Sequence, residues 1–214
     1  MHIYNELLKA TLETLYMTFF SGFLSVVFGI PIGILLYLTS INNDTISRII
    51  YRILDGFINI FRSIPFIILI VLVIPLTKLI AGTIIGPKSA VVSLTIAAIP
   101  FMARLSENTF NSLPKEMLDT AHTLGMNNTE FILKMLLPET LPKIVSDITL
   151  LLINLITYTA IAGAVGAGGL GAMAINYGYQ RFRFDVLIYD IIILISITQL
   201  IQAIGKNIEK KLLL

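Results

Sequence analysis

Five long apolar stretches constrain this chain more than any other feature of its sequence. Each is about as long as a helix that crosses the hydrocarbon core of a bilayer, which takes about 20 residues. Charged residues make up only 13% of the chain, whereas a soluble domain carries about twice that fraction. The sequence therefore predicts an all-α fold, a polytopic transmembrane helical bundle of about five spans. The predicted spans are residues 15–38, 57–80, 89–105, 148–170 and 186–205.

The segments at the two ends of the chain differ from these spans. Residues 1–14 alternate leucines with charged residues at near-helical spacing, which predicts an interfacial amphipathic lead-in. Residues 206–214 carry three lysines and are predicted to form a tail after a membrane domain of residues 15–205.

The third span is the shortest, because charged residues interrupt it. Arg104 and Glu107 are spaced i and i+3, so they lie on one helix face and can pair there. Prolines in or near the spans, such as Pro65 and Pro100, predict kinks whose freed carbonyls neighbouring helices satisfy.

The distribution of lysine and arginine predicts the orientation. With five spans the connections alternate between two sides of the membrane, and the side richer in basic residues is cytoplasmic. The N-terminus is then outside and the C-terminus inside. The richer side holds Arg48, Arg52, Arg104, Lys115, Lys134, Lys143, Lys206, Lys210 and Lys211, and the other holds Lys9, Lys78, Lys88, Arg181 and Arg183.

The longest connection, residues 106–147, falls on the predicted cytoplasmic side. A connection of this length in a small protein is usually functional or disordered, and this one is not of low complexity. Its apolar residues recur at helical spacing, and Pro114 stands where proline favours a helix start. Gly125 and the pair Asn127–Asn128 mark a break. The pattern predicts two short helices joined by a turn at the membrane surface.

A motif within this connection points to a function. Asp119-Thr120-Ala121 is followed by Gly125, and nine residues later by Met135-Leu136-Leu137-Pro138. The spacing resembles the cytoplasmic EAA motif of ABC importer permeases, with Asp for Glu, Thr for Ala and Met for Ile. The resemblance implies that this element docks on an ATPase, with Gly125 permitting a sharp exit from the helix. The implied coupling residues are Glu116, Asp119, Thr120, Ala121, His122, Gly125, Met126, Leu137 and Pro138.

Two further stretches narrow the family. The segment Phe61-Arg62-Ser63-Ile64-Pro65 and the glycine-rich segment 162–171 are similar to the permease subunit of the methionine ABC importer, a type I importer. The resemblance implies import of D- and L-methionine and close analogues across a bacterial plasma membrane. It also implies three partners, namely a second copy of the chain, a cytosolic ATPase dimer that carries ATP and magnesium, and an extracytoplasmic substrate-binding lipoprotein. We expect no cofactor in this chain and no nucleic-acid partner.

The sequence argues against enzymatic activity. Gly166, Gly168 and Gly171 spell a dinucleotide-binding pattern, but a spanning-length helix precedes them instead of a strand. The chain has no P-loop sequence, so ATP hydrolysis is expected on a separate subunit. His2 and His122 are the only histidines, and neither has a second ligand at metal-binding spacing, so we expect no metal site.

Candidate path residues are less specific. Ile161 is bulky among small residues and is predicted to help close the path on a dimer axis, while Gly163 and Gly166 favour close packing or shifting of helices. Arg62, just inside a span, is either a functional residue or an anchor near Asp55 that extends toward the interface. An importer for another amino acid or an osmolyte, and an ion-gradient-driven secondary transporter, remain alternatives.

Overall fold

The computed structural model describes residues 2–42 and 44–213, without the side chains of His2, Lys115 and His122. The described residues form helices and no strand, which confirms the all-α prediction. The α-helices are α1 (His2–Ile41), α2 (Thr45–Ser63), α3 (Phe66–Leu72), α4 (Ile74–Ala81), α5 (Pro87–Asn111), α6 (Lys115–Thr123), α7 (Asn128–Phe131), α8 (Leu137–Ala164), α9 (Gly169–Met173) and α10 (Phe184–Leu212), with π-helical turns η1 (Ile132–Leu136) and η2 (Ala174–Tyr179).

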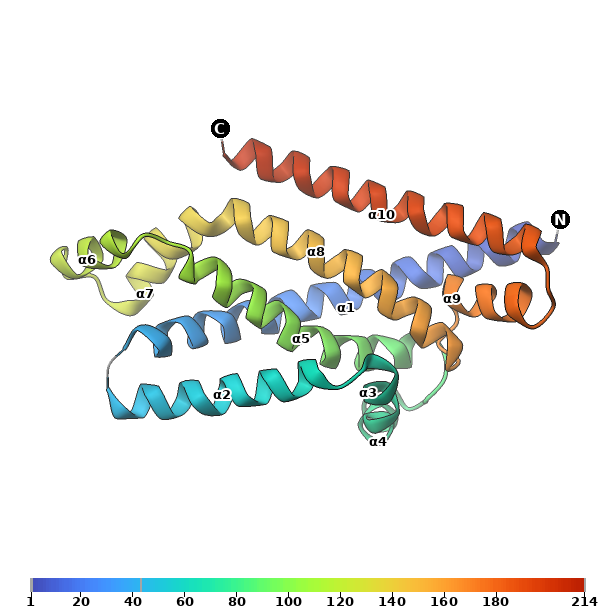
Figure 1. Cartoon of the computed structure of the whole chain (residues 1–214), viewed down its shortest axis with the longest axis horizontal. Coiled ribbons are helices and arrows are strands. Elements are labelled where there is room, and N and C mark those ends of the chain that lie inside the picture. Colours follow the sequence, from blue (N-terminus) through green and yellow to red (C-terminus); the bar gives the residue numbers. More distant parts are fainter. Residues whose placement is uncertain (1, 43, 214) are drawn as a thin grey trace.

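The helices form an elongated bundle (Figure 1). Helices α1, α2, α5, α8 and α10 run along its length, α6 and α7 lie at one end, and α9 and the N-terminus lie at the other. The central core joins α1, α5 and α8 through buried side chains such as Met17, Leu94 and Leu155. Gly33 lets α1 approach α5 closely, since a Cβ there would lie 2.6 Å from Ser106 Cβ. Such small-residue contacts are common between helices in membranes.

The second predicted span is broken, which corrects the prediction of one helix over residues 57–80. By length and apolar character four helices of the described chain qualify as spans, and the bent pair of α2 and α3 can supply a fifth. The bend between α2 and α3 is 107°. Ile64 is extended, at φ −80° and ψ 122°, because the ring of Pro65 disfavours helical geometry in the residue before it.

The other spans are longer than predicted or displaced at their ends. Helix α5 continues to Asn111 because Arg104 and Glu107 form the expected ion pair, at 2.5 Å. The charged side chains therefore do not end the helix. Helix α8 begins at Leu137 and ends at Ala164, so the predicted connection 106–147 shrinks and the fourth span stops before residue 170. Helix α10 continues through most of the predicted tail.

The predicted lead-in is not a separate element, since α1 is continuous through residue 14. Its polar side chains contact the segment that follows α8. Glu13 accepts a 2.8 Å hydrogen bond from the Gly169 amide, and Thr14 Oγ1 accepts one of 2.9 Å from Leu170. Tyr177 donates to Glu6. These bonds satisfy the free amides at the start of α9 and hold the first turns of α1 within the bundle.

Candidate functional site

The predicted ATPase-coupling segment forms a short helix at one end of the bundle. Glu116, Asp119 and Thr120 lie on the exposed face of α6. Ala121, in contrast, is 2% exposed and packs in a cluster with Phe110 and Leu136. The polar residues of α6 thus face outward, and Ala121 allows the helix to pack closely against the bundle. The side chain of His122 lies outside the described part of the chain.

Gly125 ends α6 in the way its position predicted. Its φ is +66°, in the left-handed region, and no atom lies within 4 Å of where a Cβ would be. The Met126 amide donates to the Ala121 carbonyl at 3.0 Å, which is the long hydrogen bond of a Schellman motif. Met126 packs on the same cluster as Ala121. Glycine is therefore favoured here by backbone geometry, not by lack of space.

The motif's last residues lie apart from the exposed face of α6. Leu137 is half-buried and Pro138 exposed, both in the first turn of α8. Because Pro138 has no amide hydrogen, it cannot donate to the carbonyl of Lys134. The preceding turn is π-helical, with the Leu137 amide bonded to Ile132. This proline thus shapes the junction through which α7 continues into α8.

Leu124 is a surface residue that the sequence analysis missed. Its side chain is 65% exposed. The residue directly precedes the left-handed glycine, where the chain leaves the helix and the 3.6-residue periodicity no longer applies. A large apolar side chain exposed on a polar helix is a candidate contact for a partner protein.

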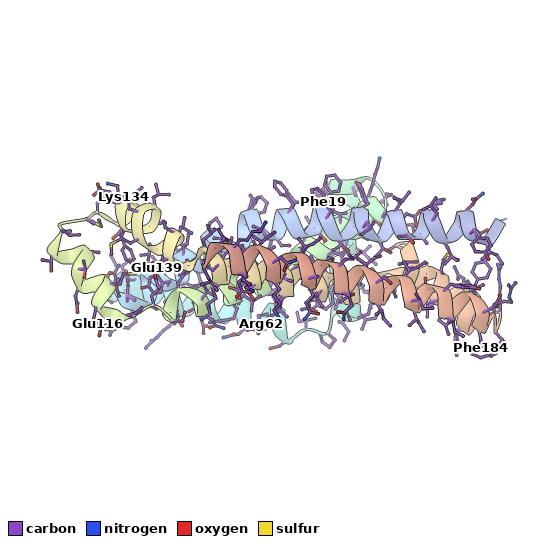
Figure 2. All side chains as sticks on the ribbon, turned by 90° about the horizontal axis from the view of Figure 1, so that it is seen from above. Phe19, Arg62, Glu116, Lys134, Glu139 and Phe184 are labelled. Atoms are coloured by element: carbon purple, nitrogen blue, oxygen red, sulfur yellow. The ribbon has the colours of Figure 1, made fainter. Side chains whose placement is uncertain are left out.

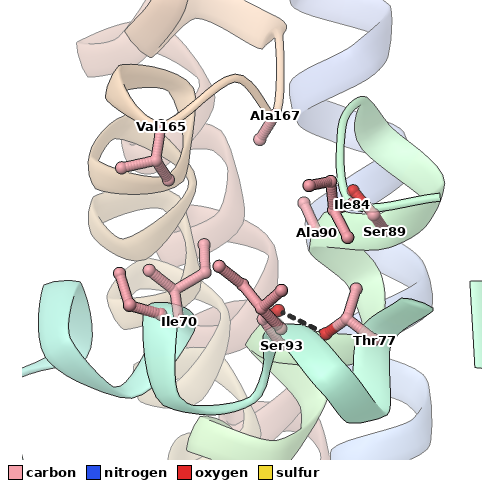
Figure 3. A pocket seen from close by; sticks show the side chains of 10 residues that line it. Ile70, Thr77, Ile84, Ser89, Ala90, Ser93, Val165 and Ala167 are labelled. Atoms are coloured by element: carbon pink, nitrogen blue, oxygen red, sulfur yellow. Dashed lines mark hydrogen bonds between the residues drawn. The ribbon is translucent and has the colours of Figure 1, made fainter. Parts of the chain in front are cut away.

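Ile161 lines neither of two nearby cavities, but its position on α8 falls between residues that line them. One cavity, of about 50 Å³, is lined by residues of α3, α4 and α5 together with Val165 and Ala167. Figure 3 shows the hydrogen bond across it between the hydroxyls of Thr77 and Ser93, at 3.1 Å. The second cavity, of about 220 Å³, includes Asn154 and Tyr158. The residues 154, 158, 161 and 165 are spaced to lie along one face of α8.

The glycines of the 162–171 segment serve packing and turning. A Cβ on Gly163 would collide with the backbone of Gly171 and Ala172, so this residue lets α8 contact α9 directly. Gly166 has φ +95°, and its carbonyl accepts a 2.9 Å hydrogen bond from the Gly86 amide. The turn therefore connects two helices and joins the start of α5.

An ion-pair network lies between α2 and α5. Arg104 binds Asp55 and Glu107, and donates to Asn59 at 3.1 Å. Tyr51 donates to Glu107 at 3.2 Å. Asp55 is thus the partner of Arg104, and no ion pair joins it to Arg62 among the described residues. Buried charges need such partners, and the network fixes α2 against α5.

Comparisons with known proteins agree with this architecture. A probable D-methionine transport permease, MetI of Vibrio cholerae, is 42% identical over 96% of this chain and 91% of its own length. The methionine import permease MetP of Bacillus subtilis is also 42% identical, over 94% of this chain and 90% of its own length.

Solved structures and a family description give the same assignment. A crystal structure of the inward-facing MetNI methionine ABC transporter aligns with a TM-score of 0.93 and 42% identity, covering 97% of this chain and 96% of the matched chain. The fold is that of type I importer permeases. The family described as binding-protein-dependent transport system inner membrane component matches residues 29–213. This chain is therefore a multi-pass inner-membrane protein that belongs to that family of transport components.

Proposed function

We propose that the chain is the permease subunit of an ATP-driven importer and forms the path by which methionine crosses the membrane. The main support for this proposal is the 42% identity, over nearly the full length, to permeases named for methionine transport. A short exposed helix, α6, also lies at one end of the bundle. A separate ATPase could dock on this helix.

The proposed coupling element is the exposed face of α6 with Leu124. Helix α6 rests on the cluster around Phe110 and Leu136, on α5 and the entry to α8, so a force applied to α6 is transmitted to two membrane helices. ATP and magnesium belong to the ATPase subunit in this proposal. Glu116, Asp119 and Thr120 contact its surface, whereas Gly125 and Pro138 set the geometry of the segment.

The proposed path runs between two copies of the chain. Five spans without an internal repeat enclose little space, and a two-fold axis would place the same face of both copies together. Ile161 then narrows the path, since its position on α8 falls between residues that line the two cavities. Replacing Ile161 with Ala should raise ATPase activity that is not coupled to uptake.

The coupling assignment is tested with Leu124→Glu in membranes that contain the ATPase. A carboxylate should disrupt an apolar contact, so we expect at least a tenfold loss of ATPase that co-purifies with the permease, and a matching loss of uptake. Leu213→Glu is the control, because Leu213 is 71% exposed and follows α10. Wild-type co-purification of the Leu124 variant would contradict the assignment.

The substrate is tested by uptake of labelled methionine into proteoliposomes with the ATPase and binding protein. Unlabelled D- and L-methionine should compete, whereas other amino acids and osmolytes should not. Uptake should require ATP inside the liposomes and binding protein outside, and should persist when ionophores collapse ion gradients. Uptake that follows an ion gradient without ATP would instead favour a secondary transporter.

A further inference from the structure

The 220 Å³ cavity lies where the second span breaks. It is lined by the end of α2, the start of α3, and facing residues of α5 and α8. Figure 2 places Arg62 between the two ends of the molecule, far from both Glu116 and Phe184. An engineered cavity of about 150 Å³ in another protein holds benzene, so this cavity has room for a small amino acid. The lining residues used below are Phe61, Arg62, Phe66, Phe101, Asn154 and Tyr158.

Three polar side chains of the cavity have no hydrogen-bond or ion-pair partner among the described residues. The guanidinium of Arg62, the amide of Asn154 and the hydroxyl of Tyr158 form no side-chain hydrogen bond or ion pair with any residue that the structure describes. Asp55, the nearest acidic residue in sequence, is bound to Arg104. Arg62 is exposed on the single chain, whereas Asn154 and Tyr158 are half-buried. Polar groups in spanning segments are costly unless satisfied, so their convergence on one cavity indicates a polar ligand.

The rest of the lining is aromatic. Phe66 is buried and stacks on Tyr158, with ring centroids 4.6 Å apart and planes within 10°. Phe61 and Phe101 also line the space. Aromatic rings attract apolar side chains, and sulfur of a thioether contacts ring edges favourably. A mostly apolar pocket with a few convergent polar groups is the usual form of a small-molecule site.

A polar stripe on α2 leads from the cavity to the end that carries α6. Arg48, Arg52, Asp55, Asn59 and Arg62 follow one another at steps of four and three residues, which places them on one helix face. Such a stripe does not face lipid in a spanning helix, because charged groups there face a cavity or the bundle interior. The cavity is therefore reached along a hydrophilic surface.

We infer that this cavity binds the transported amino acid in transit, an inference that rests on the function proposed above. Arg62 holds the carboxylate, for which a guanidinium is suited through paired hydrogen bonds. The carbonyl oxygen of Asn154 accepts from the ammonium group. The stacked rings of Phe66 and Tyr158 hold the apolar side chain. The ligand is thus a zwitterionic amino acid with an apolar side chain.

The experiment measures equilibrium binding of radiolabelled methionine to the permease–ATPase complex in nanodiscs, without the binding protein. Wild type should bind saturably, and methioninol, which lacks the carboxylate, should compete at least tenfold more weakly than methionine. Arg62→Gln should weaken methionine binding at least tenfold and reduce its preference over methioninol. Lys78→Gln should bind as wild type, since Lys78 is an exposed cation of the same broken span that does not line the cavity.

A second variant and the uptake assay separate the possible failures. Asn154→Leu should also weaken binding, and size-exclusion chromatography shows whether each variant complex remains assembled. Two outcomes would show that the cavity is not a substrate site. In one, an assembled Arg62→Gln complex binds methionine like wild type. In the other, wild type imports methionine but shows no saturable binding in nanodiscs. If wild type fails to import methionine at all, the proposed function fails instead.

Discussion

Asp190 is fully buried in α10, yet neither carboxyl oxygen has a hydrogen-bond partner among the described residues. Its neighbours along α10 pack on the first turns of α1 and on α9. A carboxyl group without a partner in such a place costs free energy instead of supplying it.

Asp190→Val should therefore stabilise the protein. A buried polar group without a hydrogen bond costs about 1–3 kcal/mol in mutational data, and the valine variant removes that cost without losing a hydrogen bond among the described residues. Thermal unfolding of the detergent-solubilised permease measures the change. Asp147→Val is the matched comparison: Thr109 donates to Asp147 at 2.6 Å, so that variant should lose about 1–3 kcal/mol. A lower unfolding temperature for Asp190→Val would show that the carboxyl has a stabilising partner.

At the scale of elements, capping residues fix the segment that carries α6 and α7. Asn127 and Glu130 form a reciprocal capping box at the start of α7, with the Glu130 amide 2.9 Å from Asn127 Oδ1. Gly125, two residues earlier, is left-handed. These adjacent motifs hold the turn between α6 and α7 in one conformation, and α6 depends on them for its position.

Gly125→Val should disturb this turn far more than Gly125→Asn. The space around Gly125 is open, so only backbone strain distinguishes the variants. A left-handed conformation costs a non-glycine residue about 1–2 kcal/mol, and asparagine tolerates it better than a β-branched residue. We expect valine to reduce ATPase co-purification several-fold, and asparagine to leave it near wild type. Equal effects of both variants would mean that the conformation of the turn does not control docking.

The sequence predicted the features that depend on neighbouring residues, and it missed those that depend on contacts between distant parts of the chain. Apolar length located the four helices that qualify as spans and the region of the bent pair. Gly125 marked the end of α6, because a left-handed turn is a local property. The break at Ile64 was underestimated as a kink, although Pro65 is also a local signal, because hydropathy continues across it. The hydrogen bonds of Glu13 and Thr14 to α9 join residues far apart in sequence, and no local pattern predicts such contacts.

The candidate site also contains features that the sequence predicted and features that depend on tertiary packing. The spacing of residues along the chain predicted the motif from Asp119 to Pro138. The exposure of Leu124, in contrast, depends on how α6 packs against the bundle. Arg62 was recognised as a charge within a span. Its relation to Asn154 and Tyr158 requires the end of α2 to reach a cavity that α8 also lines, which only tertiary packing decides.

At the scale of the whole molecule, the two ends of the bundle differ in character. One end carries α6 and α7 with charged side chains such as Glu116, Lys134 and Glu139, and the other carries Phe184 and the N-terminus (Figures 1 and 2). The chain termini point toward opposite ends, which fits the five crossings that the sequence predicts. Basic residues favour the end with α6 on the cytoplasmic side.

This orientation predicts opposite labelling of the two termini. The chain has no cysteine, so Asn5→Cys and Lys210→Cys each introduce a single thiol at an exposed position. A membrane-impermeant maleimide applied to intact spheroplasts should label Asn5→Cys, and should label Lys210→Cys only after the membrane is permeabilised. The unmodified protein is the control for background. The reverse pattern would place α6 outside the cell, where no ATPase could reach it, and would overturn both the orientation and the coupling role of α6.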